Sequence, residues 1–277
     1  SNLTKIDLKI KKSKIRGLES EGMICSLKEL GLTDNSEGIA ILEDISSEIT
    51  PLGSPVGPLL GLDDAVLDIA ITANRPDGMS MLGIARECAA IFKTKLTEPS
   101  VTKDYNFDRF EMKEKNKLNL VEGNLFSLIQ INNSQVDIKT PSYIKERLLK
   151  AGVNSINSVI DITNYVMLEL GQPLHAYDGD KLKKIAGKQS ISPEDFYVRT
   201  AEPKDSFVGL DKKVFDLKKE TCLVTCNDIP IAVAGVIGGI NCSVTENTKE
   251  IWIEAARFSQ LMIRNSSRSI GIRTESS

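Results

Sequence analysis

From Leu118 onward the hydrophobic pattern switches between helical and strand periods, and this alternation constrains the fold more than any other feature of the chain. Two segments with a helical period end in glycine, over 140–152 and 157–171. Short apolar segments typical of strands cover 125–131, 196–201, 214–217, 222–226, 231–238 and 250–255. Because tight turns such as Asn227-Asp228 join the later strands, we expect an α+β domain with mostly antiparallel sheets.

The ends of the two helices can be predicted from their capping residues. The first helix has Thr140 as its N-cap and Pro141 at its first helical position, and Gly152 ends it. The second helix has Asn157 or Ser158 as its N-cap, and Gly171 closes it.

Two polar or Pro/Gly-rich segments divide the chain into three predicted units. The segment PLGSPVGPLLG covers 51–61, and a loose polar segment covers 98–117. We therefore predict a β unit over 1–57, a small mixed α/β unit over 58–117 and the α+β domain over 118–277. The middle unit should contain a strand over 65–72 and a helix capped by Ser80.

Charge and cysteine usage exclude several classes of protein. The net charge of -3 provides no overall basic field, so a nucleic-acid partner would have to be bound locally. The longest uncharged apolar run, 229–240, is too short to span a membrane. Five scattered cysteines, without a signal peptide before them, fit a reducing cytoplasm, and the spacing of Cys222 and Cys226 does not indicate a zinc site. We expect a cytoplasmic protein without a bound metal.

His175 is the only histidine of the chain, and it lies in GQPLHAYD just after the second helix. One interpretation is a structural ring oriented by Asp178 or by a backbone carbonyl, and the others are a metal ligand or part of a reaction site. On the preceding helix, Thr163 and Asn164 are polar residues, and the Thr163 hydroxyl can bond to the carbonyl four residues earlier.

Two further features lie in the predicted strands. The run AGVIGG begins with Ala234 and Gly235, and its glycines permit positive φ or close approach of a ligand to the backbone. Glu254 ends an apolar strand, where it is either a surface residue or a buried carboxylate that needs donors or a proton.

Several motifs together resemble the β-subunit family of bacterial phenylalanyl-tRNA synthetase. These are SINSVIDITNYVMLELGQPLHAYD, PIAVAGVIGG, IWIEAARFS and GIRTESS, in this order. Upstream, KIRGLESEGMICSLKELGL resembles the end of the inserted tRNA-binding OB domain, and ITANRPDGMSMLGIARE resembles the return to the N-terminal domain. The resemblance covers nearly the whole chain and implies a fragment of a longer subunit, with residues 118–277 as its editing domain.

In that family the editing domain hydrolyses tyrosine wrongly esterified to tRNA(Phe). By position, the resemblance implies catalytic roles for His175, Thr163 and Asn164, and substrate-binding roles for Glu254, Gly235 and Ala234. The Glu254 carboxylate and the Gly235 amide would bind the phenolic hydroxyl of tyrosine, leaving both groups unpaired with phenylalanine.

The resemblance also implies partners. These are tRNA(Phe), a tyrosine moiety as editing substrate, and the synthetase α subunit in an α2β2 heterotetramer, with no DNA and no membrane. ATP and Mg²⁺ would serve the parent synthetase, and no cofactor is expected in this chain. The alternative is a tRNA and α-subunit docking scaffold with a degenerate pocket, which Asn154 favours because many relatives have arginine there. A free-standing deacylase is disfavoured by both chain ends.

Overall fold

The computed structural model of the chain describes residues 2–3, 8–32, 36, 38–42, 51–60, 65–99, 110–111, 125–132 and 139–274. Its contacts group into two compact units. One unit comprises Ser1–Asp68 with Pro141–Ser155, and the other comprises Ile69–Thr140 with Ile156–Ser277. The predicted division at residues 57 and 117 stays a prediction.

The first unit contains short strands and one helix. Its elements are β1 (Asn2–Leu3), β2 (Leu8–Lys9), β3 (Ser13–Ile15), β4 (Leu18–Ser20) and α2 (Ser142–Lys150). β1 pairs with β2 and β3 with β4, both antiparallel. A turn ends at Gly31, where the Gly31 amide donates to the Lys28 carbonyl at 2.9 Å and Gly31 has a φ of 79°.

The predicted N-cap of α2 is wrong. The Thr140 hydroxyl donates instead to the buried Asp161 carboxylate at 2.6 Å, and Pro141 occupies the N-cap position without a side-chain bond. A buried carboxylate needs donors, and Thr140 supplies one of them.

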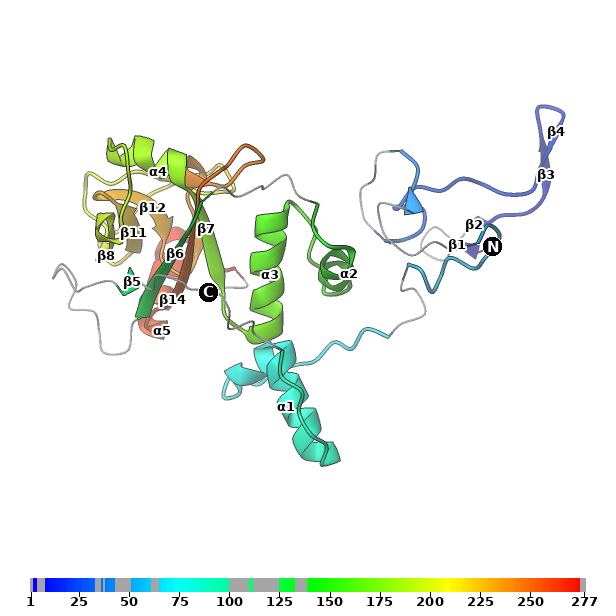
Figure 1. The fold of residues 1–277 in the computed structure, drawn as a ribbon, viewed down its shortest axis with the longest axis horizontal. Coiled ribbons are helices and arrows are strands. Elements are labelled where there is room, and N and C mark those ends of the chain that lie inside the picture. Colours follow the sequence, from blue (N-terminus) through cyan, green and yellow to red (C-terminus); the bar gives the residue numbers. More distant parts are fainter. Residues whose placement is uncertain are drawn as a thin grey trace. The chain divides into compact units, whose positions relative to one another are not determined.

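The second unit is built on two four-stranded antiparallel sheets (Figure 1). The first has the order β5-β6-β14-β7, with β5 (Phe110–Glu111), β6 (Leu125–Ile131), β14 (Ile251–Arg257) and β7 (Leu174–Asp178). The second has the order β13-β12-β11-β8, with β13 (Ile237–Gly238), β12 (Ile229–Val233), β11 (Cys222–Cys226) and β8 (Phe196–Thr200). A small pair joins β9 (Phe207–Val208) and β10 (Val214–Phe215). The predicted α+β class with mostly antiparallel sheets is confirmed.

Helices and 3₁₀ turns complete this unit: η3 (Pro76–Met79), α1 (Met81–Phe92), α3 (Ser158–Leu170), α4 (Gly179–Ala186), η4 (Pro193–Asp195), η5 (Ile240–Cys242) and α5 (Gln260–Ile270). α3 forms as predicted: the Asn157 side chain accepts from the Ile160 amide at 3.0 Å, and Gly171 closes the helix with a φ of 77°. In the part of the chain that the structure describes, no helix has the length and apolar content of a membrane span.

The inner faces of the two sheets form the main core. Trp252 and Tyr177 of the first sheet contact Phe196 of the second, with ring centroids 5.4 and 6.2 Å apart. Leu182 of α4 is fully buried in the same cluster. Burial of this apolar surface holds the sheets together and fixes the face on which the neighbouring side chains of β7 and β14 lie.

Three differences from the predicted elements matter for the site. Residues 174–178 form strand β7, which we did not predict, and the predicted strand over 231–238 is broken by a turn between β12 and β13. The described residues 65–72 contain no strand, so that prediction is wrong, and most of them are exposed. An apolar segment that pairs with no other strand lacks the packing and hydrogen bonds that stabilise a strand.

Candidate active site

The register of β7 against β14 brings His175 and Glu254 together. The two strands are antiparallel, and Glu254 lies directly opposite His175. Directly opposed side chains lie on the same face of a sheet, with Cβ atoms about 4.5–5.5 Å apart. Tyr177, two residues after His175, lies on that face as well.

Glu254 is a buried carboxylate, with 7% of its surface exposed, so the interpretation as a surface residue is wrong. The Tyr177 hydroxyl donates a hydrogen bond to Glu254 Oε2. Burial raises the pKa of Glu254 to about 7, although the bond from Tyr177 acts in the opposite direction. At neutral pH the group is therefore divided between its charged and neutral forms.

The His175 imidazole is a neutral ring at pH 7. It stands edge-on to the Tyr177 ring at 4.5 Å between centroids, and burial lowers its pKa to about 4. Part of His175 reaches solvent, but the protein atoms packed around its ring still disfavour the charged imidazolium form. A Cβ at Gly238 would lie 2.2 Å from His175 Cε1, so the ring needs glycine there.

Asp178 does not orient His175. Its carboxylate caps α4 by accepting from the Lys181 amide at 3.0 Å, and it also accepts from the Thr248 hydroxyl. Among the residues that the structure describes, no group forms a hydrogen bond with the His175 ring. Its nitrogens are therefore available to a ligand or to water.

Gly235 lies in the tight turn between β12 and β13. The Val236 amide donates to the Val233 carbonyl at 3.0 Å, and Gly235 has a φ of 65°. A Cβ there would lie 2.9 Å from Ile263 Cδ1. The Gly235 amide makes no hydrogen bond within the described ranges, which leaves a backbone donor beside the cavity.

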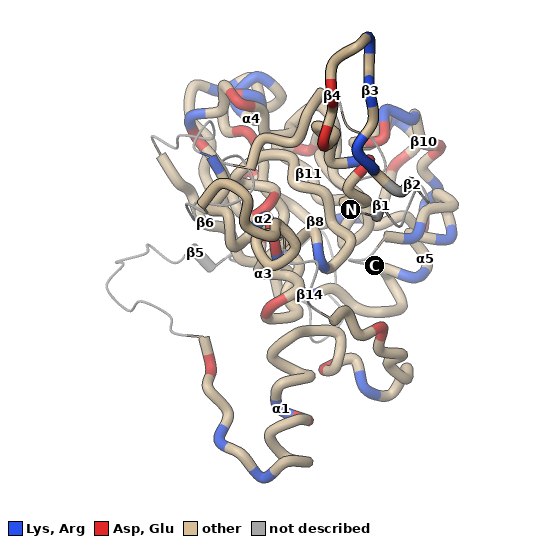
Figure 2. Tube along the Cα trace, turned by 90° about the vertical axis from the view of Figure 1, so that its right-hand side faces the viewer, with Lys and Arg blue, Asp and Glu red and all other residues tan. Residues whose placement is uncertain are grey.

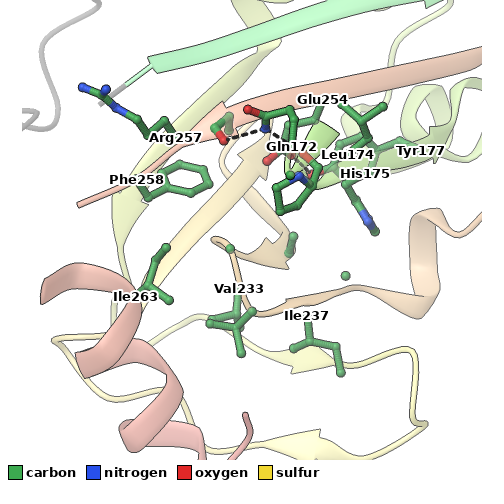
Figure 3. Close-up of a pocket in the computed structure, with 17 residues that line it drawn as sticks. Gln172, Leu174, His175, Tyr177, Val233, Ile237, Glu254, Arg257, Phe258 and Ile263 are labelled. Atoms are coloured by element: carbon green, nitrogen blue, oxygen red, sulfur yellow. Dashed lines mark hydrogen bonds between the residues drawn. The ribbon is translucent and has the colours of Figure 1, made fainter. Parts of the chain in front are cut away.

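These residues surround a cavity of about 380 Å³. Figure 3 shows His175, Tyr177 and Glu254 on one side of it, and Phe258, Ile263, Val233 and Ile237 around the remaining space. Gln172 is fixed beside it by donating to the carbonyls of Pro173 and Ala256, at 2.9 and 3.2 Å. The volume suits a small ligand, and the combination of apolar walls with few polar groups is typical of ligand sites.

Of the six predicted site residues, three line this cavity and three do not. His175, Gly235 and Glu254 line it. Ala234 is buried next to Gly235 but is not a lining residue. Thr163 and Asn164 lie on α3 and do not line the cavity. The Thr163 hydroxyl donates to the Ile160 carbonyl, three residues earlier, at 2.9 Å. The catalytic roles of both residues stay predictions.

Tyr177 and Gly238 also line the cavity, and we did not predict them as site residues. The alternation His175, Ala176, Tyr177 was the available signal, because it places the two rings on one face once the segment is a strand. The need for glycine at 238 depends on a neighbour distant in sequence and has no local signal.

No metal centre is supported by the described side chains, which include no group of three or more His, Cys, Asp or Glu residues with suitable spacing. Burial raises the pKa of the thiols of Cys222, Cys226 and Cys242 to about 12, so they are poor ligands and poor nucleophiles at neutral pH.

With this geometry in view, the comparisons with known proteins identify the family. The family model described as the B3/4 domain matches residues 124–277. This range includes α5 and the strands that carry the cavity residues, which are β7, β12, β13 and β14. The chain belongs to the B3/4 domain family. This B3/4 domain covers nearly all of the unit that we predicted over 118–277.

Relatives along the whole chain are phenylalanine–tRNA ligase beta subunits. One from Prochlorococcus marinus strain MIT 9313 is 47% identical over 277 residues, which is 100% of this chain and 34% of that protein. Another, from strain NATL2A, is 49% identical over 275 residues, 99% of this chain and 33% of that protein. The predicted resemblance to this β-subunit family is confirmed, and the chain spans about a third of the length of these relatives.

A solved structure also matches the chain. It is an N-terminal fragment of the phenylalanyl-tRNA synthetase beta-subunit from Pyrococcus horikoshii, with 16% identity and a TM-score of 0.33. The match covers 71% of this chain and 58% of that one.

Proposed function

We propose that the B3/4 domain of this chain hydrolyses tyrosine from mischarged tRNA(Phe), as the editing part of a phenylalanine–tRNA ligase β subunit. The observation that carries this proposal is the cavity in which a buried carboxylate and a neutral imidazole lie opposite each other between apolar walls. The walls suit an aromatic side chain, and the two polar groups can act on its hydroxyl and on its ester.

Glu254 is the group that we propose to select tyrosine. Its bond with Tyr177 supports this role, because it demonstrates that the carboxylate accepts a phenolic hydroxyl in this environment. The second carboxylate oxygen would accept from the substrate phenol, and the Gly235 amide would donate to it. Phenylalanine leaves these groups unpaired, at a cost of about 1–3 kcal/mol for each.

His175 would act at the ester. A water oxygen attacks the ester carbonyl, the bond to the ribose oxygen breaks, and the proton lost by the water passes to that ribose oxygen. The products are free tyrosine and uncharged tRNA. With a pKa of about 4, His175 is a weak base, so we propose that it positions the water or the ester. Thr163, Asn164 and Ala234 keep their family-derived roles only as predictions.

The remaining proposals concern the whole protein. Its partners would be tRNA(Phe) and a synthetase α subunit in an α2β2 assembly in the cytoplasm. ATP and Mg²⁺ would serve aminoacylation elsewhere in that assembly. These proposals rest on the identity with the β subunits and not on the cavity.

Deacylation by the full-length protein that carries this chain tests the editing function. We expect it to deacylate Tyr-tRNA(Phe) and to spare Phe-tRNA(Phe). Glu254→Gln should weaken discrimination about tenfold to a hundredfold, because it removes a charged acceptor, and His175→Ala should lower the rate with both esters. The exposed Glu21→Gln serves as the matched control. A wild-type protein without deacylation, or variants equal to Glu21→Gln, would contradict the proposal.

The second candidate function is a docking scaffold with a degenerate pocket. The observation that favours it is that Glu254 Oε2 already has a phenolic partner within the protein. Calorimetry with free tyrosine separates the two functions. A scaffold binds no tyrosine, whereas an editing pocket binds it more tightly than phenylalanine, and more weakly after Glu254→Gln.

A further inference from the structure

Residues 255–274 carry an unusual charge pattern next to the cavity. This segment contains four arginines and no lysine, aspartate or glutamate, in a chain whose net charge is -3. All four arginines are exposed, and they are Arg257, Arg264, Arg268 and Arg273. We name these four residues the arginine surface, and Figure 2 marks the basic positions of α5 in blue.

Most of the arginine surface has no internal counter-charge. Arg264, Arg268 and Arg273 form no ion pair with any residue that the structure describes. By contrast, Lys183 pairs with Asp180 at 3.0 Å, and Lys204 pairs with Asp228 at 2.9 Å. A group of like charges without partners costs free energy through mutual repulsion, and an anionic ligand would relieve that cost.

Helix α5 fixes the direction of this surface. Its inner side is anchored by Ser266, which is fully buried and accepts from the Cys222 amide at 2.9 Å. Arg264 and Arg268 are four residues apart, so they lie one above the other on the outer side. Substitutions at these two exposed positions should therefore leave the packing of α5 intact.

Two points of the arginine surface adjoin the cavity wall. Arg257 at the end of β14 lines the cavity, and so does Ile263, which precedes Arg264 in α5. A ligand whose reactive end enters the cavity would thus present its adjoining part to the arginines. For an ester of RNA, that adjoining part is the sugar–phosphate backbone of the 3′ end.

We propose that the arginine surface binds the backbone phosphates of the single-stranded 3′ end of tRNA and so delivers its aminoacyl ester to the cavity. The proposal rests on the proposed editing function for the choice of ligand. The chemistry fits, because the guanidinium fork binds phosphate oxygens in a bidentate manner and stacks on bases. A local basic surface also reconciles RNA binding with the acidic net charge.

The test is the affinity of the full-length protein for a single-stranded RNA oligonucleotide with the sequence of the tRNA(Phe) 3′ end, measured over a salt series. Single-strand binding loses about 0.7 in the slope of log K against log salt for each phosphate contact removed. Arg264→Ala/Arg268→Ala should therefore reduce the slope by about 1.4 and weaken binding. Arg264→Lys/Arg268→Lys should restore most of the slope, since it keeps the charges.

Lys218→Ala/Lys219→Ala is the matched control. These exposed lysines lie in a segment of mixed charge, and their removal changes the net charge by the same amount. Equal losses in both double variants would overturn the proposal, because overall charge and not the arginine surface would then govern binding. An unchanged slope in the arginine variant would also overturn it. Deacylation is measured separately, so a wild-type protein that binds through these arginines but does not deacylate contradicts the editing function alone.

Discussion

At the scale of residues, the site depends on opposite effects of burial on an acid and a base. Burial raises the pKa of Glu254 to about 7 and lowers that of His175 to about 4, because in both groups it disfavours the charged form. Both side chains therefore have substantial neutral populations near pH 7, and Tyr177 contacts each of them. The pair can exchange hydrogen bonds with a ligand without the cost of a fully buried charge.

Tyr177→Phe tests the link between Tyr177 and Glu254. The hydrogen bond from Tyr177 stabilises the ionised carboxylate, so its loss should raise the pKa of Glu254 above about 7. NMR titration of the side-chain carboxyl carbon of Glu254 would measure the change. Tyr143→Phe, at an exposed tyrosine of α2, is the control and should leave the pKa unchanged. A lower or equal pKa in Tyr177→Phe would show that the hydroxyl does not support the charged form.

At the scale of elements, the sequence predicted those that have strong local signals. Helix α3 has an Asn157 cap and a Gly171 end, and β6 and β11 lie where their apolar runs predicted them. The turn at Asn227-Asp228 also formed, with positive φ at both residues. These features depend on neighbours within a few residues, which is why sequence alone sufficed.

The elements that were missed depend on distant contacts. β7 becomes a strand because β14 pairs with it, about 77 residues further along the chain, and its own five residues are too few for their alternation to predict a strand. Helix α5 was not predicted because its single buried residue, Ser266, is polar. An apolar residue at that position would have strengthened the helical hydrophobic pattern. The choice of His175 and Glu254 came from the family resemblance, whereas their direct pairing needed the register.

Asp205→Ala should destabilise the second unit more than loss of an exposed ion pair would. Arg199 and Asp205 are 5% and 2% exposed, and they share two hydrogen bonds at 2.6 and 2.8 Å. Removing Asp205 takes two hydrogen bonds from a buried guanidinium, which keeps Asp228 as a charged partner at 2.7 Å, so the cost is about 1.5–3 kcal/mol. Glu21→Ala breaks the exposed pair with Lys12 and should cost at most about 1 kcal/mol. Urea unfolding measures the free energy of unfolding of both variants. Equal losses would mean that the buried Arg199–Asp205 pair stabilises the fold no more than the exposed Lys12–Glu21 pair.

At the scale of the whole molecule, two units of different character share one chain. The second contains both sheets, the cavity and the arginine surface, whereas the first consists of short strands and α2. The chain returns to the first unit at 141–155 before it forms α3. The B3/4 match begins at residue 124 and so includes this excursion.

The pH dependence of stability should separate the two site residues. Between pH 4.5 and 7 the folded chain keeps a proton on Glu254 that the unfolded chain has released, so this contribution to stability falls as pH rises. Between pH 4 and 6.5 the unfolded chain protonates His175 and the folded chain does not, so this contribution rises with pH. The two effects oppose each other from pH 4.5 to 6.5.

Glu254→Gln should therefore make stability rise more steeply with pH over that range, and His175→Gln should make it fall. Each difference from wild type approaches about 1.4 kcal/mol per pH unit within the window. Urea unfolding at several pH values measures it, with the fluorescence of Trp252, the single tryptophan of this chain, as the probe. Variant and wild-type curves that stay parallel would contradict the assigned pKa directions.

The pairing of His175 with Glu254 across β7 and β14 has a consequence for errors in assembly. Side chains alternate between the faces of a strand, so a slip of β7 by one residue would place His175 and Tyr177 on the face opposite to Glu254. Such a misfolded chain could keep its secondary structure and still lack the site completely. Ligand binding at this cavity therefore reports on whether the sheet has assembled in register, and a mixture of registers would lower the number of binding sites per chain without changing the affinity of the sites that remain.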